Sequence, residues 1–115
     1  GYRLDEKQRP TFLCSWKGLH VEDAPRPVGE QDLYVMQRTL HVRGDAGAAK
    51  VWFRAAVGDT IQKAAPGAFR IDDKWTLYVK SGGEAIVRSS AGEFELLVPV
   101  LLHEGQATVE LTYDW

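Results

Sequence analysis

The chain is short of cysteine and asparagine. Cys14 is the single cysteine among 115 residues, which excludes an internal disulfide and any metal cluster built only from cysteines of one chain. With no asparagine there is no N-glycosylation site and no Asn-Gly turn. No apolar run reaches the ~18 residues of a membrane-spanning helix, and no signal-peptide pattern opens the chain. The fold must therefore depend on the chain's own hydrophobic core.

The chain also lacks a large net charge and the common enzyme motifs. Fourteen Lys and Arg against sixteen Asp and Glu give a net charge of −2, which disfavours a general binder of nucleic acid or anionic membranes. Phosphate-binding loops, Gly-x-Ser-x-Gly and His-Glu-x-x-His do not occur. His20, His41 and His103 have no metal-ligand spacing to one another or to Cys14, so we expect no metal site and no cofactor.

What is present is the alternation of apolar and polar residues that is typical of β-strands. Helical periodicity is nearly absent, and turn residues recur every 8–12 positions. With 44% hydrophobic residues and this length, residues 1–115 form one domain. We predict an all-β fold with little or no helix, an antiparallel β-sandwich, with a barrel as the alternative. About nine strands are expected, at residues 11–16, 19–22, 33–43, 50–57, 68–72, 74–80, 84–88, 94–102 and 107–113.

Prolines shape three expectations. Pro25 and Pro27 remove ladder donors, so residues 24–29 are predicted to be a connection and not a central strand. Residues 60–65 are the only stretch expected to form a helical turn, which the Pro66-Gly67 pair would end. Pro99 predicts an edge position or a bulge in the last long apolar strand.

Cys14 alternates with Phe12 and Trp16, so these three side chains share one face of the first long strand. Leu19 and Val21 are expected to face inward on the next strand. A cysteine on the apolar face behaves as a small hydrophobic residue. We therefore predict that Cys14 is buried and inert towards thiol reagents.

Glu93 and Glu95 form the one carboxylate pair with catalytic spacing. They share a strand face at a separation of ~7 Å, which is within reach of glycosidase geometry. A catalytic acid needs a buried or apolar setting, whereas this pair has the pattern of a solvated strand face. A glycan hydrolase is accordingly the weakest of the functional hypotheses.

Trp52 is the residue that most suggests binding. It alternates out of phase with Val51, Phe53, Ala55 and Val57, so its ring is expected to lie outside the main core. An exposed tryptophan on a β-sandwich can stack on a sugar ring or anchor a protein interface. The candidate ligand-binding residues are Trp52, Arg54 and Lys50, and packing over the outside of a sheet is the alternative role for Trp52.

The chain begins without Met and reaches strand-like sequence at once, which predicts a domain taken from a longer polypeptide. A resemblance to known proteins lies in residues 1–5, 9–12, 21–23, 51–58 and 96–100. These segments resemble part of large secreted bacterial proteins of planctomycete type, which combine a sugar-dehydrogenase-like propeller with c-type cytochrome modules. It implies an all-β accessory domain in the periplasm or outside the cell, and it carries over no catalytic residue.

These observations favour three functions in order. The first is a non-catalytic accessory module that docks against neighbouring domains of the same polypeptide, in an electron-transfer or sugar-oxidising protein. The second is a carbohydrate-binding module that uses Trp52. The third is the hydrolase built on Glu93 and Glu95. No nucleic acid and no membrane insertion is expected in any of them.

Overall fold

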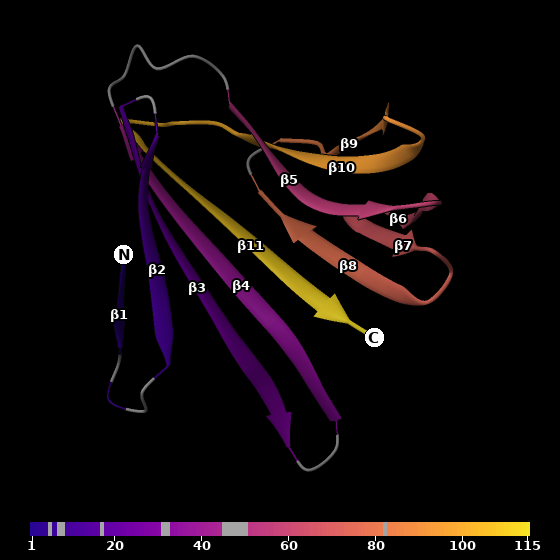
Figure 1. The fold of residues 1–115 in the computed structure, drawn as a ribbon, viewed down its shortest axis with the longest axis horizontal. Coiled ribbons are helices and arrows are strands. Elements are labelled where there is room, and N and C mark those ends of the chain that lie inside the picture. Colours follow the sequence, from indigo (N-terminus) through magenta and orange to yellow (C-terminus); the bar gives the residue numbers. More distant parts are fainter. Residues whose placement is uncertain (5, 7–8, 17, 31–32, 45–50, 82) are drawn as a thin grey trace.

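A computed structural model shows an all-β fold of two antiparallel sheets (Figure 1). It describes residues 1–4, 6, 9–16, 18–30, 33–44, 51–81 and 83–115. The predicted β-sandwich without helix is confirmed, with eleven strands in place of about nine. No helix in the described part of the chain could cross a membrane. The strands are β1 (Tyr2–Leu4), β2 (Pro10–Trp16), β3 (Leu19–Glu30), β4 (Leu33–Gly44), β5 (Val51–Gly58), β6 (Ile61–Ala65), β7 (Ala68–Ile71), β8 (Trp75–Lys80), β9 (Ile86–Ser90), β10 (Glu93–Val100) and β11 (Gln106–Asp114).

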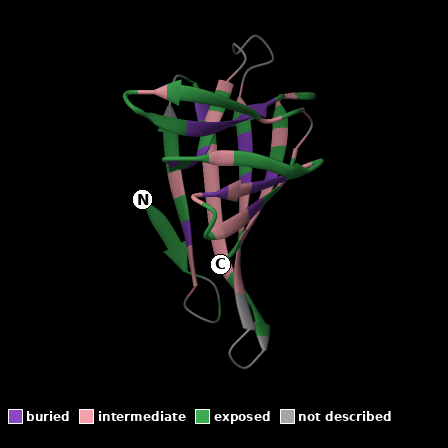
Figure 2. Cartoon of the chain, turned by 90° about the vertical axis from the view of Figure 1, so that its right-hand side faces the viewer, coloured by how far each residue is buried: buried purple, intermediate pink, exposed green. Residues whose placement is uncertain are grey.

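The two sheets differ greatly in size. The large sheet has the strand order β1-β2-β3-β4-β11-β8-β7-β6, and the small sheet has the order β5-β10-β9. Strands of the small sheet run across those of the large one (Figure 2). One of the places where the chain passes from one sheet to the other is the corner between β5 and β6. There a Cβ on Gly58 would lie 2.9 Å from a carboxylate oxygen of Asp72, so any other residue would require the Asp72 side chain to shift.

The hydrophobic core lies where the two sheets overlap. From the small sheet come Leu96 and Val98 of β10, which are fully buried. The large sheet contributes apolar side chains that lie side by side on neighbouring strands and point inward. Examples are Leu40 beside Val109, and Leu111 beside Val79. The complete core is Leu19, Leu40, Val42, Ala55, Ala56, Phe69, Ile71, Leu77, Leu96, Val98, Val100, Val109 and Leu111.

The proline-containing segment 24–29 is a strand, so its predicted role as a connection is wrong. β3 continues through it to Glu30 and pairs with β4 along its whole length, with Pro25 opposite Arg38 and Pro27 opposite Met36. β2 pairs with β3 only as far as Asp23. Beyond that point β3 is an edge strand on one side, and an edge tolerates residues that cannot donate to a ladder.

The helical turn predicted at residues 60–65 is also wrong. Residues Ile61–Ala65 form β6, which pairs with β7 through the turn at Pro66 and Gly67. The Asp72 N–H donates to the Thr60 carbonyl, and the Thr60 N–H donates to the Asp72 carboxylate. These two hydrogen bonds tie the start of β6 to the end of β7. Tertiary pairing thus overrides the weak helical preference of the two alanines in this segment.

β5 carries a bulge that reverses part of its predicted facing. Leu96 pairs with Ala56 and Leu97 pairs with Arg54, so Ala55 has no residue opposite it. The extra residue turns Val57 outward, where it is 41% exposed, although the alternation predicts Val57 on the face of Val51 and Phe53. Pro99 of β10 lies past the end of β9, which stops opposite Leu97, so the predicted edge-like position is confirmed.

Leu111 tests the position of the core. Its side chain is 0% exposed in β11, between β4 and β8, whereas Leu101 is 43% exposed. We expect Leu111→Ala to lower the free energy of unfolding by about 2–5 kcal/mol, because it leaves a cavity in the core. Leu101→Ala should cost less than about 1 kcal/mol. Urea denaturation of both variants measures this, and equal losses would contradict the described packing.

Candidate functional site

The main candidate site is an open groove between the two sheets. It consists of two adjoining hollows of about 400 Å³ and about 510 Å³. Both are bordered by Phe12, Asp23 and Arg38, so they form one continuous groove. Along one side lies β5, with Val51 and Phe53 at the first hollow and Ala55 and Ala56 at the second. The floor is the inner face of β2, β3, β4 and β11.

The groove exists because the small sheet stops short of β2. The register places Phe12 in one row with Asp23 and Leu40, and Cys14 in one row with Val21 and Val42. The predicted facing of Phe12 and Cys14 with Leu19 and Val21 is therefore right. The predicted burial of Cys14 is wrong, because its side chain is exposed and Phe12 is 48% exposed. These side chains point towards the space between the sheets, but no described part of the small sheet covers them.

An arginine lies in the middle of the groove floor. Arg38 donates two hydrogen bonds to the Asp23 carboxylate, at 2.8 and 2.5 Å, and a third to the Tyr113 hydroxyl at 3.3 Å. Its guanidinium carbon also lies 5.0 Å from the centre of the Phe53 ring. The bonds to Asp23 raise the pKa of Arg38 above its ordinary value, although burial acts in the opposite direction. Arg38 thus stays charged and is neutralised by Asp23.

Aromatic side chains close one end of the groove. Trp75 stacks on Tyr113 with ring centres 5.6 Å apart, and Trp115 meets the Trp75 ring edge-on at 5.8 Å. The Tyr113 hydroxyl donates to the Ala55 carbonyl at 3.2 Å and so links the floor to β5. This end therefore presents flat apolar rings beside a small number of polar groups, a combination typical of binding sites.

The sequence analysis does not predict this groove as a site. The available signal was Arg38, a charged residue that shares a strand face with Met36, Leu40 and Val42. A charge on an apolar face needs a partner, which is Asp23 of β3. The predicted strand 19–22 ends one residue before Asp23, whereas β3 continues through Asp23 to Glu30.

Trp52 and Arg54 lie on β5, and Lys50 lies outside the described residues. Trp52 is opposite Pro99 and is 37% exposed, and it borders the first hollow. It does not belong to the buried core, as its alternation predicts. Arg54 extends over the outside of the small sheet, where its guanidinium lies 3.8 Å from the Glu95 carboxylate.

Glu93 and Glu95 do not form the predicted solvated pair. Glu93 is exposed, but Glu95 is buried to 4% exposure. Arg88, which is opposite Glu95 on β9, binds its carboxylate through two nitrogens, and Arg54 approaches from β5. The arginine side chains cover Glu95 and satisfy it. The arrangement is that of a structural ion pair.

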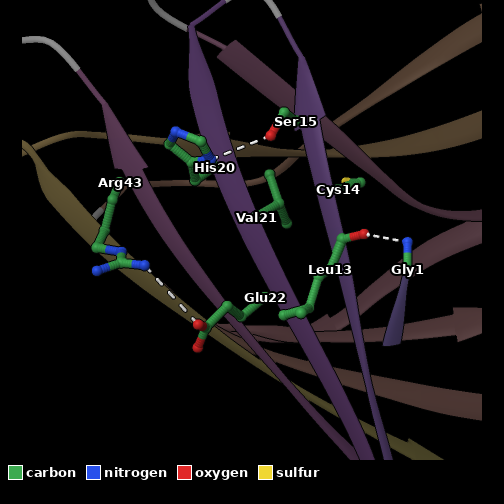
Figure 3. Close-up of a pocket in the computed structure, with 8 residues that line it drawn as sticks. All are labelled: Gly1, Leu13, Cys14, Ser15, His20, Val21, Glu22 and Arg43. Carbon is green, nitrogen blue, oxygen red and sulfur yellow. Dashed lines mark hydrogen bonds and ion pairs between the residues drawn. The ribbon is translucent and has the colours of Figure 1, made fainter. Parts of the chain in front are cut away.

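A separate hollow, which is not part of the groove, lies on the outer face of the large sheet (Figure 3). Ser15 is 3.0 Å from Nδ1 of His20, and Arg43 is 3.8 Å from Glu22. A hydrogen bond from Arg3 lowers the pKa of Glu22, and the charges of Arg3, Arg43 and His41 add to this effect. The side chains of these cross-strand pairs are largely exposed and satisfy one another. They form a polar surface, with no group of three metal-ligating side chains among the described residues.

Comparisons with known protein families, curated proteins and solved structures find no match to this chain. The site must therefore be interpreted from its own geometry. That geometry is an antiparallel β-sandwich with an open, mainly apolar groove that is neutral at its centre.

The reactivity of Cys14 tests whether the groove is open. As the only cysteine, it gives a single signal. We expect a water-soluble thiol reagent to label the native protein at a rate within about tenfold of the rate in the unfolded protein, since the thiol is exposed. Absorbance stopped-flow in buffer and in urea measures both rates. Protection of the native thiol by several orders of magnitude would mean that the groove is closed.

Proposed function

We propose that the chain is a non-catalytic docking module whose groove receives part of a neighbouring domain of the same polypeptide. The observation that carries the proposal is the exposed inner face of β2 and β3. An apolar sheet face that points towards the interior but is exposed to solvent is typical of a site at which another protein segment binds. The same idea follows from the resemblance to large secreted multidomain proteins, in which such a domain would be periplasmic or extracellular.

The composition of the groove supports this proposal. Tryptophan, tyrosine and arginine contribute most of the binding energy in protein interfaces, and Trp75, Tyr113 and Arg38 line the second hollow. Phe12, 48% exposed, lies at the junction of the two hollows. An aromatic side chain in this central place can anchor a partner at small entropic cost.

Carbohydrate binding is the second candidate function. It rests on Trp52, 37% exposed, and on Arg54, which follows two residues later on the same strand. Exposed Ile86 and Val57 extend the apolar surface on the small sheet. A sugar ring could stack on Trp52 while Arg54 donates to its hydroxyls. Trp52 borders the first hollow, but Phe12 lies on the floor of the groove, so variants of Trp52 and of Phe12 distinguish the two functions.

Site-specific cross-linking in the full-length natural protein tests the docking function. A benzophenone-bearing phenylalanine analogue is placed at Phe12, and the matched control carries it at Tyr78. The two positions are 48% and 47% exposed, but Tyr78 lies on the outer face of the large sheet. We expect one defined cross-link from position 12, mapped by mass spectrometry to a neighbouring domain, at a yield at least about fivefold above position 78.

Other outcomes would overturn the docking function. Equal, diffuse cross-linking from both positions would mean that the groove has no partner. Binding of a glycan that Trp52→Ala abolishes and Phe12→Ser leaves intact would replace docking by the carbohydrate-binding candidate.

A further inference from the structure

β5 is an edge strand of the small sheet and borders the groove from Val51 to Ala56. It pairs with β10 on one side, and no described strand pairs with it on the other. The Ala55 carbonyl accepts a hydrogen bond from Tyr113 on the floor, so this side of β5 reaches the large sheet. An unpaired strand edge presents a row of N–H and C=O groups, which is a template for another strand.

The floor beneath this edge is an uncovered sheet face. A strand placed beside β5 would lie over Phe12 and Val21 at the first hollow, and over Met36 and Trp75 at the second. Side chains of a strand alternate between its two faces, so every second residue would point at this floor. One added strand would therefore pair the edge and cover the exposed apolar residues at the same time.

We propose that the groove binds an extended β-strand of the partner, which joins the small sheet beside β5 with alternate uncharged apolar side chains facing the floor. The inference rests on the docking function and names the form of the docked segment. An acyl chain or a helix could cover the floor, but neither would pair the backbone edge of β5. A β-strand supplies both interactions.

The charges of the groove determine which residues the strand carries. Arg38 and Asp23 neutralise each other, with hydrogen bonds of 2.8 and 2.5 Å. Among the described residues that line the two hollows, no other side chain is charged. A charged side chain facing the floor would therefore lose its hydration without gaining a partner. The complementary strand has uncharged residues on its inner face, and its length matches the eight residues of β5.

The probe for this proposal is an acetylated and amidated peptide of eight residues in which valine alternates with threonine. Two matched peptides carry N-methyl groups, one on all valines and the other on all threonines. In an added strand only alternate N–H groups point at β5. We expect the unmodified peptide to bind, one methylated peptide to bind with similar affinity, and the other to bind about tenfold or more weakly. Isothermal titration calorimetry measures all three.

Two further measurements locate the peptide. Amide hydrogen exchange of β5 should slow in the complex, while exchange at β9, the opposite edge of the small sheet, should not change. Phe12→Ser should weaken binding about tenfold or more, and Tyr78→Ser should leave it unchanged. Both protein variants alter exposed positions, so the fold is kept.

Three results would overturn the strand proposal. They are no binding of the unmodified peptide at millimolar concentration, equal affinity of the two methylated peptides, or a dimer of the chain itself that Phe12→Ser dissociates. A defined cross-link from position 12 combined with equal affinities of the methylated peptides would keep the docking function and reject only the strand. If position 12 gave no defined cross-link and the two methylated peptides bound with equal affinity, the docking function would be rejected as well.

Discussion

The three-stranded small sheet is too narrow to cover the whole inner face of the eight-stranded large sheet. Neighbouring strands lie about 4.8 Å apart, so a three-stranded sheet is roughly 14 Å wide, whereas a strand of twelve residues such as β3 or β4 is about 40 Å long. Because the small sheet runs across the large one (Figure 2), it covers only part of these strands. Where it does, Leu40 and Leu111 form a core. Where it does not, Phe12 and Cys14 are exposed.

The Arg38–Asp23 pair lies in the part of the large sheet that the small sheet leaves uncovered. A charged residue on the inner face of a sandwich is costly to bury, and it is tolerated here because the groove leaves both side chains partly exposed. The pair links β3 to β4 at Asp23, the last residue of β3 that pairs with β2, and the Tyr113 hydroxyl joins it to β11 and β5. Polar contacts thus fasten the sheets together in a region where few apolar contacts are available.

The sequence predicts the fold class and most strands, because alternation and turn residues are local signals. Its failures have physical causes. The prolines of β3 predict a connection, but they lie past the last described pair with β2, and only the partner strand determines where an edge lies. The bulge at Ala55 turns the Val57 side chain to the outer face, and no local sequence signal predicts this bulge. Cys14 faces the predicted way and is still exposed, because alternation gives the face of a residue and not what covers that face.

The openness of the groove could therefore not be predicted from the sequence, beyond the signal of Arg38. Fluorine NMR of protein labelled with 4-fluorophenylalanine tests it directly, since the chain has four phenylalanines. A soluble gadolinium chelate should broaden the signal of Phe12, 48% exposed, and spare that of Phe69, 3% exposed. A Phe12 signal as well protected as that of Phe69 would contradict an open groove.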